Sequence, residues 1–214
     1  MALITPRSTG TTDQFHQQAI LTLQPGRITE LAGFTGLGMT RLGLRMLAAP
    51  SRRSPVVTLD VKGWLSPLAA WEVGVDPERL VVIRCPDPEM WTQLAAVLME
   101  GVRAMYAEVP ATVRDHDLRR LAALARARQV GVVLRHLGEG LPSGVAYLRL
   151  RALEVHWEGT EEGYGRLSRR HLVVEASGKA MAGMTRRIEM VDDGADLVCL
   201  VPGLGAGKGG RAAG

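Results

Sequence analysis

The feature that constrains this chain most is an alternation of apolar runs and helical patterns between residues 27 and 135. Short apolar runs predict strands at 27–32, 56–60, 80–84, 104–109 and 130–135. Helical spacing of apolar residues predicts helices at 39–49, 67–73, 88–102 and 115–128. Strands that alternate with helices usually pair in parallel through crossover connections. The sequence therefore predicts an α/β fold, a mostly parallel central sheet flanked by helices.

From about residue 145 the pattern changes to strands without helices between them. Apolar runs predict strands at 145–150, 151–157, 170–175, 185–191 and 195–201. Turn residues lie at 161–163 (Glu-Glu-Gly) and at 192–194 (Asp-Asp-Gly). We expect these strands to be antiparallel and connected by hairpins.

The chain divides into a core and two flanking segments. Residues 1–25 form a polar N-terminal segment, with one short helix expected at 13–23. Residues 26–202 form the core domain, with a C-terminal β extension from about 145. Residues 203–214 are rich in glycine and alanine, and we expect this tail to be disordered.

Composition excludes several classes of protein. Of the 214 residues, 46% are hydrophobic and 22% charged, which excludes intrinsic disorder for most of the chain. No apolar run reaches eighteen residues and the N-terminus lacks the apolar region of a signal peptide, so we expect a cytoplasmic protein without membrane contact. Cys85 and Cys199 each lie alone in an apolar run, as buried reduced thiols do. Neither a metal-ligand spacing nor a hydrolase nucleophile motif is present.

A glycine-rich loop follows the first predicted strand. Residues 33–40 read Gly-Phe-Thr-Gly-Leu-Gly-Met-Thr, which fits the phosphate-loop spacing G-x-x-x-x-G-K-[ST] except that Met39 replaces the lysine. Gly33, Gly36 and Gly38 would let backbone N–H groups converge on phosphate oxygens, and Thr40 could contact Mg²⁺. Since a thioether cannot neutralise phosphoryl charge, we expect hydrolysis to be slow or absent. A turn formed only for packing is the alternative.

Residues 24–99 resemble the nucleotide-binding core of the RecA recombinase family. The stretches GRITELAGFTGLGMTRLGL and VVTLDVKGWLSPLAAWEVGVDPERLVVI carry the resemblance. In that family the second strand ends Asp-Ala-Glu, where this chain has Asp60, Val61 and Lys62. The resemblance implies a RecA-like P-loop NTPase core that could hold ATP or ADP with Mg²⁺, although none is required.

The same resemblance assigns roles beyond the loop. It implies that Asp60 and Lys62 lie at the nucleotide, that Glu108 replaces an acid that assists Mg²⁺, and that His136 replaces a γ-phosphate-sensing glutamine. The family's catalytic Glu falls on Lys62, so no catalytic residue is assigned. Either Lys62 places its ammonium near the phosphates, or it points into solvent and Met39 is an apolar residue of the first helical turn.

Arginine supplies almost all of the positive charge. The chain has 23 Arg and 3 Lys and a net charge of +4, which indicates phosphate recognition or a GC-rich genome. Eight arginines and three acids lie between 110 and 151. They predict a surface for nucleic acid or a partner protein, the alternative being a solvated helix face. The candidates of this and a second cluster near 170 are Arg119, Arg120, Arg126, Arg135, Arg166, Arg169 and Arg170.

Within the RecA-related proteins, the chain resembles the ImuA branch. The degenerate loop, the short 137–144 segment where a recombinase has a long DNA loop, and the block VPATVRDHDLRRLAALARARQVGVVLRH carry this likeness. It implies a DNA-repair accessory in SOS-response translesion synthesis, with a Y-family polymerase-like partner. DNA and a second copy of the chain are further candidate partners. The alternatives are a DNA-dependent ATPase that uses Lys62, and an interaction module whose phosphate space is filled by Phe34, Leu37 and Met39.

Overall fold

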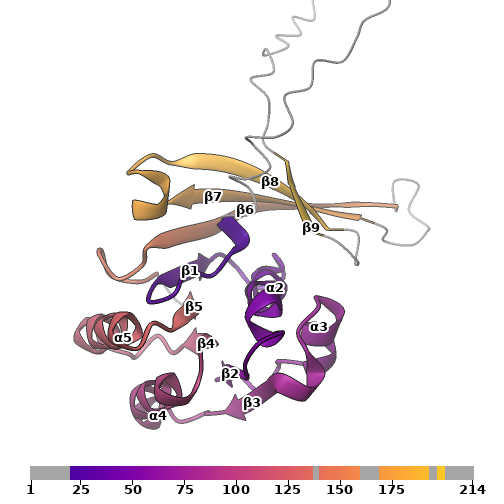
Figure 1. Ribbon diagram of the computed structural model, residues 1–214. Helices are drawn as coiled ribbons and strands as arrows, with labels where there is room; N and C mark the ends of the chain where they lie inside the picture. Colours follow the sequence, from indigo (N-terminus) through magenta and orange to yellow (C-terminus); the bar gives the residue numbers. More distant parts are fainter. Residues whose placement is uncertain (1–19, 137–139, 160–168, 193–196, 201–214) are drawn as a thin grey trace, which may run out of the picture.

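The computed structural model describes residues 20–136, 140–159, 169–192 and 197–200 (Figure 1). A single sheet of nine strands runs through this part of the chain in the order β3-β2-β4-β5-β1-β6-β7-β8-β9. The predicted α/β class, with a mostly parallel sheet, flanking helices and antiparallel C-terminal strands, is confirmed.

Five parallel strands form one half of the sheet. They are β1 (Ile28–Ala32), β2 (Val56–Asp60), β3 (Leu80–Arg84), β4 (Ala104–Val109) and β5 (Gly131–His136). Their apolar runs are continuous because both faces of the sheet are covered, and β2 and β4 are buried along their whole length. The carboxyl ends of these strands therefore meet at one edge, where ligands bind in open α/β sheets.

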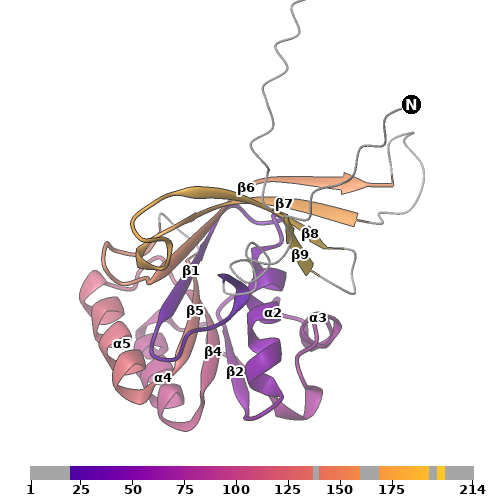
Figure 2. The ribbon, with the colours of Figure 1, turned by 45° about the horizontal axis from the view of Figure 1, so that its top comes forward.

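Helices cover both faces (Figure 2). On one face lie α2 (Met39–Ser51) and α3 (Pro67–Glu72), and on the other α4 (Pro88–Gly101) and α5 (Asp115–Arg128). Two 3-10 turns, η1 (Pro77–Arg79) and η2 (Lys179–Met181), complete the described elements. Two hydrophobic clusters result, one between the sheet and α2, the other between the sheet and α4 with α5.

The buried face of α4 differs from the expected one. Sequence spacing places Met90, Leu94, Val97, Leu98 and Gly101 on one face, as the apolar stripe. In the structure Trp91, Ala95 and Met99 are fully buried, whereas Met90 and Val97 are exposed. The helix is apolar around much of its circumference, and burial of the larger Trp91 ring removes more apolar surface from water.

The antiparallel half contains β6 (Leu148–Glu158), β7 (Arg169–Ser177), β8 (Arg186–Asp192) and β9 (Leu197–Leu200). The prediction of separate strands at 145–150 and 151–157 is wrong, because β6 is one continuous strand. Its first residues pair in parallel with β1, and its whole length pairs antiparallel with β7. Its pairing with β7 has a register shift between Ala152 and Glu154.

Several sequence predictions fall outside the described residues. These are most of the helix at 13–23, the turns at 161–163 and 193–194, the tail at 203–214, Arg166, and the side chain of Cys199. Cys85 is buried with a free thiol. Within the described ranges, no helix has the length and apolar character needed to cross a membrane.

Candidate functional site

The glycine loop lies at the carboxyl edge of the sheet, between β1 and α2. Gly33, Gly36 and Gly38 have φ angles of 133°, 88° and 75°, which favour glycine over any residue with a side chain. Gly38 is the N-cap of α2 and no side chain caps this helix end. The first N–H groups of α2 thus lack a side-chain acceptor, as expected where a helix start faces an anion.

Met39 does not face the loop. Its side chain is 0% exposed and belongs to the hydrophobic cluster under α2. Phe34, by contrast, is 86% exposed at the loop, so it does not fill a phosphate-sized space. Leu37 packs partly against the same cluster as Met39. These three side chains therefore do not together fill the space that a phosphate would occupy, as the interaction-module alternative expects.

Thr40, in the first turn of α2, lies next to the buried phenol of Tyr106. Burial raises the pKa of Tyr106, and the charge of Glu108 raises it further. The nearby Thr40 side chain and the charge of Arg135 oppose this rise. The hydroxyl of Tyr106 is buried without a hydrogen-bond partner among the described residues.

Asp60, at the end of β2, is fully buried and both of its carboxylate oxygens are engaged. Oδ1 accepts a hydrogen bond from the Gly63 N–H at 2.8 Å, and Oδ2 accepts one from the Leu65 N–H at 3.1 Å. The carboxylate thereby fixes the turn that follows β2, as an aspartate commonly does with nearby backbone N–H groups.

Glu108, near the end of β4, binds the same turn from the neighbouring strand. Its Oε2 accepts the N–H groups of Val61 at 3.3 Å and Lys62 at 3.4 Å, and its Oε1 accepts the indole N–H of Trp64. Burial raises the pKa of Glu108, with a smaller contribution from the charge of Asp60. The two acids that the sequence assigns to nucleotide and Mg²⁺ thus act together as backbone acceptors.

Lys62 and His136 lie at the same edge. The side chain of Lys62 is exposed, and only its backbone N–H joins the acidic pair. His136, the last residue of β5, is half-buried, and its Nδ1 accepts the N–H of Gly140 at 3.2 Å. The residues predicted to surround a nucleotide are therefore neighbours at this edge, but their described contacts are with the protein itself.

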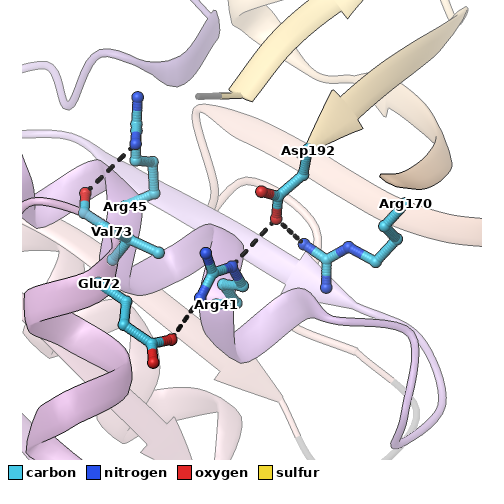
Figure 3. A network of polar contacts seen from close by, with 6 residues as sticks. All are labelled: Arg41, Arg45, Glu72, Val73, Arg170 and Asp192. Atoms are coloured by element: carbon cyan, nitrogen blue, oxygen red, sulfur yellow. Dashed lines mark hydrogen bonds and ion pairs between the residues drawn. The ribbon is translucent and has the colours of Figure 1, made fainter. Parts of the chain in front are cut away.

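Arg170 on β7 lies against the loop, although the sequence places it in a surface cluster. Figure 3 shows its guanidinium directed at Asp192. A Cβ atom at Gly38 would lie 2.0 Å from Arg170 Nη1, so the guanidinium occupies the space that a side chain there would need. Arg170 is 6% exposed, and its Nη2 donates to Asp192 Oδ2 at 2.6 Å. The same oxygen accepts Nε of Arg41 at 3.0 Å, and Arg41 also pairs with Glu72.

Strand pairing explains how Arg170 reaches this position. Trp157, Arg170 and Asp192 form one row across β6, β7 and β8, and the guanidinium carbon lies 5.8 Å from the Trp157 ring centroid. Arg41 meets the row from α2. The sequence could have predicted this contact only if the hairpin between the two strands had been aligned so that residue 170 pairs with residue 192.

The remaining predicted arginines separate into exposed and buried groups. Arg119, Arg120 and Arg126 are exposed on α5, and Arg169 is exposed on β7. Arg119 pairs with Asp115 at 3.7 Å, whereas Arg120 and Arg126 form no ion pair with any described residue. Arg135 is buried, so it does not contribute to the α5 surface.

A comparison with protein families gives a match. Residues 20–141, more than half of the chain, match the family model described as the MT3502 N-terminal domain. No curated protein matches the chain.

Proposed function

The chain belongs to the MT3502 N-terminal domain family, and we propose that it is a RecA-like accessory protein of DNA damage tolerance with a degenerate nucleotide site. It works in SOS-response translesion synthesis through protein and DNA contacts, and not through ATP hydrolysis. The proposal combines the resemblance of residues 24–99 to a RecA core with the geometry at the carboxyl edge of the sheet.

One observation carries the loss of hydrolysis. Asp60 and Glu108 are both 0% exposed, and their four oxygens accept hydrogen bonds from residues 61–65. A carboxylate that binds or orients a metal must offer an oxygen to it. With Met39 in the core, the loop itself supplies no phosphate-binding cation, and Lys62 in place of the family's general base cannot position the attacking water.

The exposed face of α5 supports DNA contact. Arg120 and Arg126 project from a rigid helix without acidic partners among the described residues, and Arg119 lies beside them. Guanidinium groups in this arrangement bind phosphates irrespective of base sequence, with a strong dependence on salt. We expect this surface to contact the DNA backbone.

The partner expected from the resemblance is a Y-family polymerase-like protein. A second copy of the chain is a further candidate. ATP or ADP with Mg²⁺ would then serve only as a bound ligand of the loop, without turnover.

The first test is ATP turnover by the purified full-length chain, with and without DNA. We expect no turnover above that of a protein-free control, while turnover at the rate of a working ATPase would refute the proposal. Lys62→Ala separates the two hypotheses, because it should abolish turnover only if Lys62 replaces the loop lysine. Lys179→Ala, which removes another exposed lysine, is the matched control.

The second test is direct binding to the polymerase-like partner. Size-exclusion chromatography of the two purified proteins should give a complex of defined stoichiometry. Two separate peaks at micromolar concentrations of both proteins would count against the accessory function.

A further inference from the structure

We propose that Arg170 is the cation of the glycine loop, supplied by β7, and that Asp192 holds it as an internal substitute for a phosphate-type anion. The inference extends the proposed function, on which it rests for placing a phosphate group at this loop. It adds a binding residue from the antiparallel strands and a competitor for the ligand within the chain.

The Arg170 guanidinium lies at the start of α2. It contacts Gly38, the N-cap of the 13-residue helix α2, where the helix dipole is positive and no side-chain acceptor is present. A buried cation at this end of a helix is unfavourable unless an anion joins it. An anion bound by the N–H groups of α2 would lie within reach of the same guanidinium.

The charge of Arg170 is incompletely compensated. Its Nε is buried without a hydrogen-bond partner, and its described carboxylate partner, Asp192, shares one oxygen with Arg41. Burial lowers the pKa of Arg170, and the charge of Arg41 adds to this effect against the opposing influence of Asp192. A phosphate would offer the acceptors that the guanidinium lacks.

Arg135 is a second buried guanidinium, on the side of the sheet that α2 covers. It is 4% exposed, its Nε has no acceptor, and its guanidinium forms no hydrogen bond or ion pair with any described residue. Side chains alternate along β5, and Val133, two residues earlier, packs in the hydrophobic cluster beneath α2. Arg135 therefore adds positive charge to this side of the sheet.

Asp192 competes with the proposed anion for Arg170. Its carboxylate lies 2.6 Å from Arg170 and has the same charge sign as the proposed ligand. Binding of the anion therefore weakens the Arg170–Asp192 pair, and this couples the loop to the β7–β8 hairpin. A Cβ atom at Gly38 would already lie 2.0 Å from Arg170 Nη1, so the guanidinium must move when a phosphate enters at the start of α2.

Pyrophosphate is the probe for the experiment, because it presents phosphate oxygens without a base or sugar. Calorimetric titration of the full-length chain should show binding that Arg170→Gln weakens by about tenfold or more, the loss expected for a charge-assisted hydrogen bond. Arg187→Gln removes an exposed guanidinium of the neighbouring strand β8 and should leave the affinity unchanged. Asp192→Asn should tighten binding, since it neutralises the competitor.

A thermal measurement covers variants that fold poorly. Pyrophosphate should raise the Tm of the wild-type chain above that in chloride of equal ionic strength, because a ligand that binds the native state stabilises it. Arg170→Lys, which keeps the charge but not the planar fork, should show a smaller rise. The proposal would be overturned if Arg170→Gln bound pyrophosphate as tightly as wild type does. It would also be overturned if neither wild type nor Asp192→Asn bound pyrophosphate, which would indicate that Arg170 only packs against the loop.

Magnesium ADP distinguishes a nucleotide from a free phosphate group as the natural ligand. Tighter binding of Mg-ADP than of pyrophosphate, with the same dependence on Arg170, indicates a nucleotide. The proposed accessory function would fail in other experiments, by ATP turnover or by the absence of a complex with the polymerase-like partner. Neither result depends on these titrations.

Discussion

A Cβ atom at Gly38 would lie 2.0 Å from Nη1 of Arg170 and 2.7 Å from its Cζ. Glycine is therefore required here both by a φ of 75° and by contact with a side chain 132 residues away in sequence. The loop and the antiparallel strands consequently depend on each other for their shape.

This contact predicts that Gly38→Ala is more damaging than Gly36→Ala. Both positions have positive φ, which disfavours alanine by about 1 kcal/mol, but no atom lies within 4 Å of a Cβ at Gly36. We expect Gly38→Ala to reduce the free energy of unfolding by roughly 1–3 kcal/mol more than Gly36→Ala, since the buried ion pair must shift. Urea denaturation measures both, and equal losses would show that Arg170 moves aside freely.

Removal of the indole N–H of Trp64 should destabilise the protein even though the ring is half exposed. Trp64→Phe leaves buried Oε1 of Glu108 without its donor, for an expected loss of roughly 1.5–3 kcal/mol. The Trp64 hydrogen bond lowers the pKa of Glu108, so the variant raises that pKa further, and the loss should shrink as pH falls through it. Trp71→Phe, at a similarly exposed tryptophan, should have little effect in the same urea titrations.

His171 should remain protonated above the usual pH range of histidine. Its Nδ1 lies 2.9 Å from Glu189 and its Nε2 lies 2.6 Å from Glu158, and these two hydrogen bonds raise its pKa above 6.5. The resulting stabilisation is complete below pH 6.5 and is lost as pH rises through the folded-state pKa. NMR titration should show the pKa falling in Glu189→Gln and staying unchanged in Glu175→Gln, which alters another glutamate of the sheet. A value at or below 6.5 in wild type would contradict the geometry.

The α5 surface should determine how DNA affinity depends on salt. The double change Arg120→Glu and Arg126→Glu should weaken binding of a labelled DNA by at least about tenfold and reduce the salt slope by roughly one unit per lost phosphate contact. Arg52→Glu with Arg53→Glu changes the charge equally at two exposed arginines after α2. If fluorescence anisotropy shows equal losses for both pairs, net charge and not α5 accounts for the binding.

Much of the fold follows from local sequence. The apolar runs at 56–60, 80–84 and 104–109 coincide with β2, β3 and β4. Both β2 and β4 are buried on both faces, so their apolar runs are continuous. The spacing in α4 is less informative, because Met90 and Val97 offer a second apolar face and only tertiary packing selects Trp91.

The candidate site is harder to predict because its contacts join distant segments. The loop glycines can be read from their spacing, and Asp60 from its place at the end of an apolar run. Glu108 is assigned by the family resemblance. Asp60 and Glu108 bind the backbone of residues 61–65 because of the way the chain turns after β2. Arg170 contacts Gly38 because of the register between distant strands. Neither is contained in the pattern of one segment.

The position of β6 has a consequence for any shortened form of this protein. Residues 20–141 match the family model, yet β1 has β5 on one side and β6, which begins at Leu148, on the other. A chain cut after 141 would expose the backbone N–H and C=O groups of β1 along a fresh sheet edge, next to the glycine loop. Such an edge recruits strands from other molecules, so the shortened chain should aggregate where the full chain remains dispersed.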